Sequence, residues 1–289
     1  MPSKLHDAIA QRLGSAVKLA RPVTGGDVND ASQLTLGDGR VVFVKTREGC
    51  APDTFVREAD GLVWLAETQT LRIPRVLASS DGSDGAPPFI ALEWIAQAPR
   101  APDHDAQLGR GLAAMHRAGS PVYGAYRDSY LARFLQRNTP CATFAELWVT
   151  QRLEPQLRLA LDAGLGSSTL KRGFESVFAR IDALVGPPEP PARLHGDLWG
   201  GNVLSDERGL PVLVDPAPYG GSREVDLAMM RLFGGFSAGV FAAYEGVFPL
   251  APGHEERVAL WQLYPLLVHV NLFAGSYVAS LERTLRTLV

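Results

Sequence analysis

The sequence predicts an α+β fold in two lobes, a small β-rich N-terminal lobe over residues 1–95 and a larger, mainly helical C-terminal lobe over residues 96–289. Short runs of β-branched residues dominate before residue 96, and amphipathic helical spacing dominates after it. With 289 residues, of which 46% are hydrophobic and 20% charged, the chain is long enough and apolar enough to bury a core in each lobe.

The N-terminal lobe is predicted to begin with a short amphipathic helix and to continue as a sheet. Leu5, Ile9 and Leu13 recur at every fourth position, and Gly14 is a suitable helix end. The Gly-Asp-Gly segment at 37–39 is typical of a hairpin turn. The expected strands cover residues 17–23, 31–36, 41–45 and 88–95, with a helix from about residue 53 before the last of them.

The C-terminal lobe is predicted to be helical. Its first helix places Leu108, Leu112 and Met115 on one face. The proline-rich segment 187–191 ends a helix and leads into an extended segment. The expected helices cover residues 104–117, 144–161, 170–184 and 255–288.

Composition excludes several classes of partner. The net charge is −3 and no basic, aromatic-interleaved patch is present, so we expect no nucleic-acid partner. No apolar run approaches eighteen residues and no signal peptide is recognisable, so we expect no membrane partner and a cytoplasmic location. Cys50 and Cys141 are too few for a disulfide framework, and we expect free thiols in a monomer.

One loop carries the strongest functional signal. Residues 194–202 read Leu-His-Gly-Asp-Leu-Trp-Gly-Gly-Asn, and thirteen residues after Asn202 comes Asp215. The spacing of five between Asp197 and Asn202 equals that of the protein-kinase loop H-R-D-L-x-x-x-N. Phosphoryl transfer needs one carboxylate to orient the attacking hydroxyl, and an amide with a second carboxylate to hold magnesium. The sequence therefore predicts Asp197 as the base, and Asn202 and Asp215 as magnesium ligands.

The alternative interpretation is that these residues only form turns, since Asp, Asn and Gly are common turn formers. It requires the motif and the later Asp215 to coincide at the right distance by chance. For His195 we favour a structural role, bracing the loop by backbone hydrogen bonds, because Asp197 already occupies the position of the base.

The N-terminal lobe supplies candidates for nucleotide binding. Lys45 lies in an apolar strand, and Glu58 follows it by thirteen residues on the next helix, which suits the lysine–glutamate ion pair of kinases. Three other acidic residues compete for this lysine, namely Glu48, Asp60 and Glu67.

Two further segments are candidates for the phosphates and the base. Gly25, Gly26 and Asn29 lie in a turn that can bring backbone N–H groups to phosphates, although the same residues also suit an ordinary hairpin. Backbone groups of Glu93, Trp94 and Ile95 end a strand where a hinge is expected and can read the adenine edge. Alternatively, this segment is simply a buried strand leaving the sheet.

With these motifs in place, the chain resembles the fructosamine kinase family, also called ketosamine kinases. The resemblance covers most of the chain, and its most specific parts are His-Gly-Asp-Leu-Trp with Gly-Gly-Asn at 195–202 and Leu-Phe-Gly-Gly-Phe at 232–236. It implies a protein-kinase-like bilobal fold and ATP- and Mg²⁺-dependent phosphorylation of the sugar 3-hydroxyl of a ketosamine. The acceptor is a small molecule or a glycated protein lysine, and the implied role is repair of glycated proteins.

Two other interpretations stay open. The generic His-x-Asp…Asn pattern also fits aminoglycoside or choline phosphotransferases, and a catalytically silent nucleotide-binding module is the alternative from another class. Retention of Lys45, Asp197, Asn202 and Asp215 together argues against the silent module.

Two features near the loop concern the substrate and the support of the loop. The indole of Trp199 can stack on the C–H face of a sugar, or anchor the loop in the core, and the sequence does not separate these roles. We expect Arg223, Glu224 and Asp226 to brace the catalytic loop, with recognition of the substrate amine by an acidic residue as the alternative.

Overall fold

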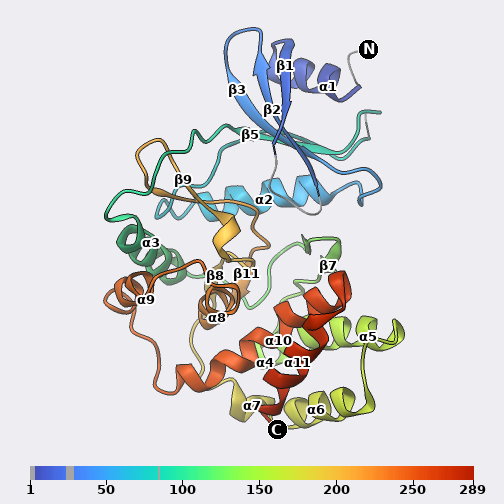
Figure 1. Cartoon of the computed structure of the whole chain (residues 1–289), viewed down its shortest axis with the longest axis vertical. Coiled ribbons are helices and arrows are strands. Elements are labelled where there is room, and N and C mark those ends of the chain that lie inside the picture. The colour runs from blue at the N-terminus through green and yellow to red at the C-terminus, as the bar shows by residue number, and fades with distance from the viewer. Residues whose placement is uncertain (1–3, 24–28, 84) are drawn as a thin grey trace. The chain divides into compact units, whose positions relative to one another are not determined.

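The computed structural model describes residues 4–23, 29–83 and 85–289 and confirms the α+β fold (Figure 1). The chain forms two compact units. The first unit contains residues 1–104 together with two later segments, 129–135 and 202–217. It therefore consists of three separate stretches of the chain and not of one continuous piece. The second unit contains residues 105–128, 136–201 and 218–289.

The first unit is built on an antiparallel five-stranded sheet with the strand order β1-β2-β3-β5-β4. Helix α1 (Lys4–Leu13) packs on this sheet through Ile9, which is fully buried. The turn at residues 37–39 joins β2 and β3 as predicted, with Leu36 N donating to Arg40 O at 2.8 Å. The strands are β1 (Val17–Pro22), β2 (Asp30–Leu36), β3 (Val41–Thr46), β4 (Val76–Ser80) and β5 (Phe89–Glu93).

Alternation along β3 separates the core from the functional face. Val42 and Val44 belong to the core beneath α1, whereas Lys45 points to the other side and meets Glu58 of α2 (Thr54–Ala66). The buried face of α2 carries Phe55, Leu62 and Leu65, which confirms the helical spacing read from the sequence.

The later segments of the first unit are two hairpins. Strands β6 (Ser129–Leu131) and β7 (Phe134–Gln136) pair, and β6 contacts α2. Strands β9 (Val203–Ser205) and β10 (Pro211–Leu213) pair antiparallel and end just before Asp215.

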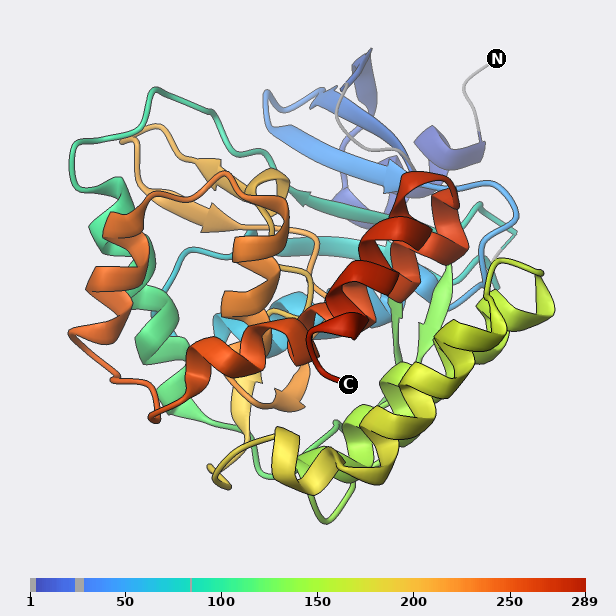
Figure 2. The same ribbon diagram turned by 60° about the horizontal axis from the view of Figure 1, so that its bottom comes forward.

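The second unit is mainly helical, with one small antiparallel pair of strands, β8 (Ala192–Leu194) and β11 (Tyr219–Gly221). Its long helix α10 packs against α8, α5 and α11, and Figure 2 shows α10 and α11 running side by side. The helices are α3 (His104–Ala118), α4 (Phe144–Leu147), α5 (Glu154–Asp162), α6 (Ser168–Ala179), α7 (Ile181–Leu184), α8 (Glu224–Phe233), α9 (Ala238–Glu245), α10 (His254–Phe273) and α11 (Ser276–Arg286). Of the described helices, none has the length and apolarity needed to cross a membrane.

Three helices expected to be continuous are interrupted. The segment 170–184 is divided into α6 and α7 at Arg180, whose φ of −120° and ψ of 13° are not helical. The segment 144–161 contains a π-helical stretch, Trp148–Leu153, between α4 and α5. The segment 255–288 breaks at Ala274 and Gly275, whose φ angles of 51° and 57° lie outside the helical region, and this break separates α10 from α11.

Candidate active site

In the first unit, Lys45 holds two carboxylates together. Its ammonium Nζ lies 2.8 Å from Glu58 Oε1 and 2.7 Å from Asp215 Oδ1. The predicted ion pair with Glu58 is thereby confirmed, and Glu48, Asp60 and Glu67 are not among the ion-pair partners of Lys45 that the described residues show. Strand β3, helix α2 and the segment after β10 each contribute one charge to this cluster, which we call the Lys45 centre.

The segment after β10 is held so that Asp215 projects its carboxylate. Val214 N donates to Asn202 O at 3.0 Å, and the side-chain amide of Asn202 donates to Asp215 O at 3.4 Å. Asp215 itself has a φ of 53°, in the left-handed region that non-glycine residues rarely adopt. Such a conformation costs on the order of 1 kcal/mol and persists only where its surroundings impose it.

The Lys45 centre carries more negative than positive charge. Burial alone would lower the pKa of Lys45, but the charges of Glu58 and Asp215 outweigh this effect and raise the pKa above its ordinary value. Burial raises the pKa of Glu58, against the attraction of Lys45 and with the repulsion of Asp215. Because Glu58 and Asp215 share one ammonium, the Lys45 centre has room for a further positive charge.

The donor set suits a hard divalent cation. The carboxylate of Asp215, 46% exposed, and the buried amide of Asn202 offer oxygen ligands of the kind that Mg²⁺ prefers. The residues present therefore fit the magnesium ion that the resemblance implies.

The other residues predicted for the nucleotide are distributed over the first unit. Gly25 and Gly26 lie outside the described residues. Asn29 directly precedes β2, and its Oδ1 is buried with no hydrogen-bond partner among the described residues. Glu93 ends β5, with its carboxylate 3.0 Å from Arg75 Nε, and Trp94 and Ile95 follow where the chain leaves the sheet.

In the second unit, the loop after β8 is held by hydrogen bonds to the carboxylate of Asp226 in α8. The backbone N–H groups of His195 and Gly196 donate to the two oxygens of Asp226 at 2.7 and 2.9 Å, and His116 Nε2 lies 3.1 Å from Oδ2. This arrangement confirms that Asp226 braces the loop that contains Asp197. Asp197 follows two residues after His195, and its N–H donates to His195 Nδ1 at 3.3 Å, so the structural role expected for His195 is also confirmed.

Charge and tautomer are fixed around Asp226. Burial alone would raise the pKa of Asp226, but the hydrogen bonds from His116 and from the Gly196 amide help to keep the pKa below its ordinary value. Because an ionised carboxylate only accepts, His116 must carry its proton on Nε2. The other ring nitrogen of His116 lies 2.8 Å from the hydroxyl of Tyr244.

Trp199 lies on the surface of the second unit. The residue is 43% exposed, which excludes the role of an anchor in the core. The indole covers the backbone of Gly201, where a Cβ would come within 2.3 to 2.7 Å of three ring carbons. Glycine at position 201 is therefore what allows the ring to lie this close to the backbone of the loop.

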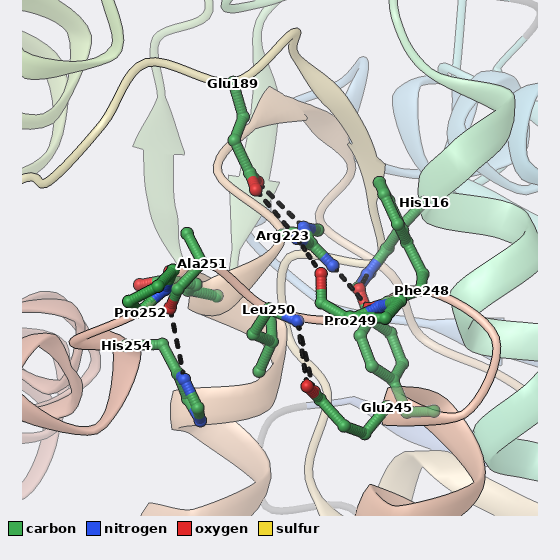
Figure 3. Close-up of polar contacts among 12 residues, drawn as sticks. His116, Glu189, Arg223, Glu245, Phe248, Pro249, Leu250, Ala251, Pro252 and His254 are labelled. Carbon is green, nitrogen blue, oxygen red and sulfur yellow. Dashed lines mark hydrogen bonds and ion pairs between the residues drawn. The ribbon is translucent and has the colours of Figure 1, made fainter.

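The charged residues at the start of α8 anchor that helix. Arg223 forms a two-pronged ion pair with Glu189, both distances being 2.7 Å, and also donates to the carbonyls of Phe248 and Pro249 (Figure 3). Glu224 is buried and accepts from Arg257 and from the indole N–H of Trp261. These contacts favour bracing over the alternative of binding a substrate amine, because Arg257 and Trp261 already donate to the buried carboxylate of Glu224.

Sequence reasoning missed the supports of this loop. His116 and Tyr244 are 110 and 18 residues away from Asp226 along the chain, and neither belongs to a motif. A buried Asp requires donors, but only the fold shows which elements supply them.

The fold and the two groups of residues define a class. The fold is that of the kinase-like phosphotransferases. A family model described as fructosamine kinase matches residues 1–289, and the chain belongs to this family.

Individual relatives agree over nearly the whole length. A crystal structure assigned as a fructosamine-3-kinase from Thermobifida fusca superimposes with a TM-score of 0.90 at 37% identity, covering 98% of both chains. A protein assigned as a ketoamine kinase in Enterococcus faecium is 36% identical over 91% of this chain and 93% of its own length. The chloroplastic protein-ribulosamine 3-kinase of Arabidopsis thaliana is 34% identical over 92% of this chain and 82% of its own length.

Proposed function

We propose that this protein is an ATP-dependent kinase that phosphorylates the sugar 3-hydroxyl of ketosamines and so contributes to the repair of glycated proteins. Membership of the fructosamine kinase family and the name of the Arabidopsis thaliana relative support this activity. The observation that carries the proposal is the Lys45 centre, because a buried lysine paired with a helix glutamate and a second, half-exposed aspartate is the arrangement that aligns nucleotide phosphates in kinases.

The residues of the first unit are assigned to the nucleotide. Lys45, positioned by Glu58, orients the phosphates, and Asn202 and Asp215 would hold Mg²⁺. A bound magnesium ion supplies neutralisation of the charge that develops on the phosphoryl oxygens. The loop with Gly25 and Gly26 is assigned to the phosphates.

Three further positions complete the nucleotide assignment. Asn29 is assigned to the phosphates, and its buried Oδ1, which lacks a partner among the described residues, supports a polar ligand there. The backbone of Glu93, Trp94 and Ile95 is assigned to the adenine, since it follows the end of β5.

The residues of the second unit are assigned to the acceptor. Asp197 orients the attacking hydroxyl and accepts its proton, while Asp226 holds the backbone of the loop in place. Trp199 offers an exposed ring face on which the apolar face of a sugar can stack, and this exposure supports a role at the substrate. The acceptor is a ketosamine, either as a small molecule or on a protein lysine. The monomeric state and the cytoplasmic location stay predictions.

ADP release tests the activity directly. With Mg²⁺ and ATP we expect turnover on ribulose-lysine and fructose-lysine and none on kanamycin or choline. The Asp197→Asn variant serves as the matched control, and kcat should fall by roughly 10²–10⁴ because a positioned base is lost. Turnover on kanamycin or choline alone would overturn the substrate assignment, and absence of turnover on all four despite nucleotide binding would favour the silent module.

A further inference from the structure

The β6–β7 hairpin is an unusual part of the first unit. The chain leaves the second unit after Asp128, contributes residues 129–135 to the first unit, and re-enters the second at Gln136. In this short excursion Ser129 and Leu131 are buried, and β6 lies against α2. Residues 129–135, which come from the mainly helical part of the sequence, thus contact α2, the helix that carries Glu58.

The hairpin contacts the start of α2 through the carboxylate of Asp53. The hydroxyl of Tyr130 donates to Asp53 Oδ1 at 2.8 Å, and Asp53 directly precedes α2. The other oxygen of Asp53 lies 2.5 Å from Arg57 Nε, one turn into the helix. Asp53 therefore links the hairpin to the first turn of α2 with both of its oxygens. Burial alone would raise the pKa of Asp53, but the hydrogen bonds from Arg57 and Tyr130 keep the pKa below its ordinary value.

The hairpin also grips the end of β3. Arg47 follows Lys45 by two residues, and its Nη1 donates to the carbonyl oxygen of Ala132 at 3.1 Å. Ala132 forms the turn of the hairpin with a φ of 53°, a left-handed conformation that alanine rarely adopts. One hairpin thus contacts both elements whose alignment sets the Lys45–Glu58 pair, namely β3 and α2.

We propose that the β6–β7 hairpin is a built-in brace that keeps α2 in the position where Glu58 pairs with Lys45, with Tyr130 as a positioning residue for nucleotide binding. In kinases this ion pair must be in place for phosphate alignment, and the position of the glutamate helix is a point of control. Here the hairpin supplies the constraint from within the chain, so the pair is assembled without phosphorylation or a partner. The inference deepens the proposed function and rests on its assignment of Lys45 to the nucleotide.

The test is a double-mutant cycle read by Mg²⁺–ATP binding in calorimetry. Tyr130→Phe removes only the hydroxyl and should weaken ATP binding by about threefold to tenfold, the scale of one ordinary hydrogen bond. If Tyr130 acts through the ion pair, the same substitution in a Glu58→Gln background should weaken binding no further. A merely structural contribution would instead add to the effect of Glu58→Gln.

A matched control and a second measurement make the outcome decisive. Tyr126→Phe removes a hydroxyl from a tyrosine that is 73% exposed, and it should leave ATP binding unchanged. Hydrogen exchange should become faster in the amides of α2 in Tyr130→Phe and stay unchanged in α6. Unchanged ATP affinity, or additive effects with Glu58→Gln, would overturn the proposal. Because the readout is nucleotide binding, a failure of ketosamine phosphorylation leaves this result interpretable.

Discussion

Two aspartates that follow the catalytic loop in sequence have opposite surroundings. Asp226 is buried at 1% side-chain exposure and receives N–H donors from His195, Gly196 and His116. Asp215 is 46% exposed, meets an ammonium that it shares with Glu58, and has a left-handed backbone. The chain itself satisfies the first carboxylate, whereas around the second the negative charge is in excess. This difference separates a carboxylate that holds the structure from one that is available to a ligand.

The comparison predicts its largest effect for Asp226→Asn. An amide in this position places an N–H group against the N–H donors of the loop or of His116. Removing one partner from a buried, charged hydrogen-bond network costs about 3–5 kcal/mol. We expect the free energy of unfolding in urea to fall by this amount, whereas Asp182→Asn, at an exposed position of α7, should be near neutral.

The pH dependence of this loss checks its electrostatic origin. Because the pKa of Asp226 is depressed in the folded protein, its stabilising contribution is fully present above about pH 4, the ordinary value for Asp, and is lost as the pH falls through the folded value. The difference in the free energy of unfolding between the wild type and Asp226→Asn should therefore be constant from neutral pH down to about pH 4, and it should decrease below that pH. A difference that stays constant below pH 4 would contradict this origin.

Asp215→Asn should have a different signature. A neutral amide cannot balance the charge of a divalent cation, so kcat should fall by roughly a hundredfold or more, about 3 kcal/mol of transition-state stabilisation. Nucleotide titration with and without Mg²⁺ should show that the dependence on the metal is lost. The melting temperature should stay close to that of the wild type. A loss of stability as large as that of Asp226→Asn would remove the distinction between the two aspartates.

The two aspartates also show what the sequence can and cannot predict. The spacing of Asp197, Asn202 and Asp215 is local, and the Lys45–Glu58 pair follows from a strand and the next helix, so both were predictable. The contacts of Asp226 with His116 and of Asp53 with Tyr130 were not, because they join residues 110 and 77 positions apart. Long-range pairing of this kind depends on tertiary packing, which no short window of sequence contains.

The interrupted helices make the same point for local structure. Residues 148–153 keep an apolar spacing that fits an α-helix, yet they form a π-helical stretch with Trp148 and Leu153 buried. Ala274 is a good helix former and still ends α10 with a φ of 51°. At these positions packing decides against intrinsic propensity.

Trp199→Ala tests a residue of the neighbouring loop, and we expect its effect to be smaller than that of Asp215→Asn. If the exposed indole is a sugar platform, KM for the ketosamine should rise by the loss of stacking, on the order of 1–3 kcal/mol by analogy with base stacking, while KM for ATP stays nearly constant. Trp199→Phe should restore much of the affinity because it keeps a ring face. Should both KM values rise together and the melting temperature fall, the indole serves the loop and not the substrate.

The smallest expected effect is that of Asp215→Gly on the free energy of unfolding. This variant tests whether the negative charge of Asp215 destabilises the folded protein. Asp215→Gly removes a carboxylate from the Lys45 centre and relieves the left-handed conformation. Exposed Gln69 has the same φ of 53°, so Gln69→Gly provides the backbone effect alone. Relief of strain and the extra freedom of glycine in the unfolded chain nearly cancel, so each variant should change the free energy of unfolding by at most about 1 kcal/mol. If repulsion between Asp215 and Glu58 outweighs the attraction of Asp215 to Lys45, Asp215→Gly should be the more stable of the two in urea unfolding. If Gln69→Gly is instead the more stable variant, the carboxylate of Asp215 stabilises the fold, as that of Asp226 does. Only the exposure of Asp215 would then distinguish it as a candidate ligand-binding residue.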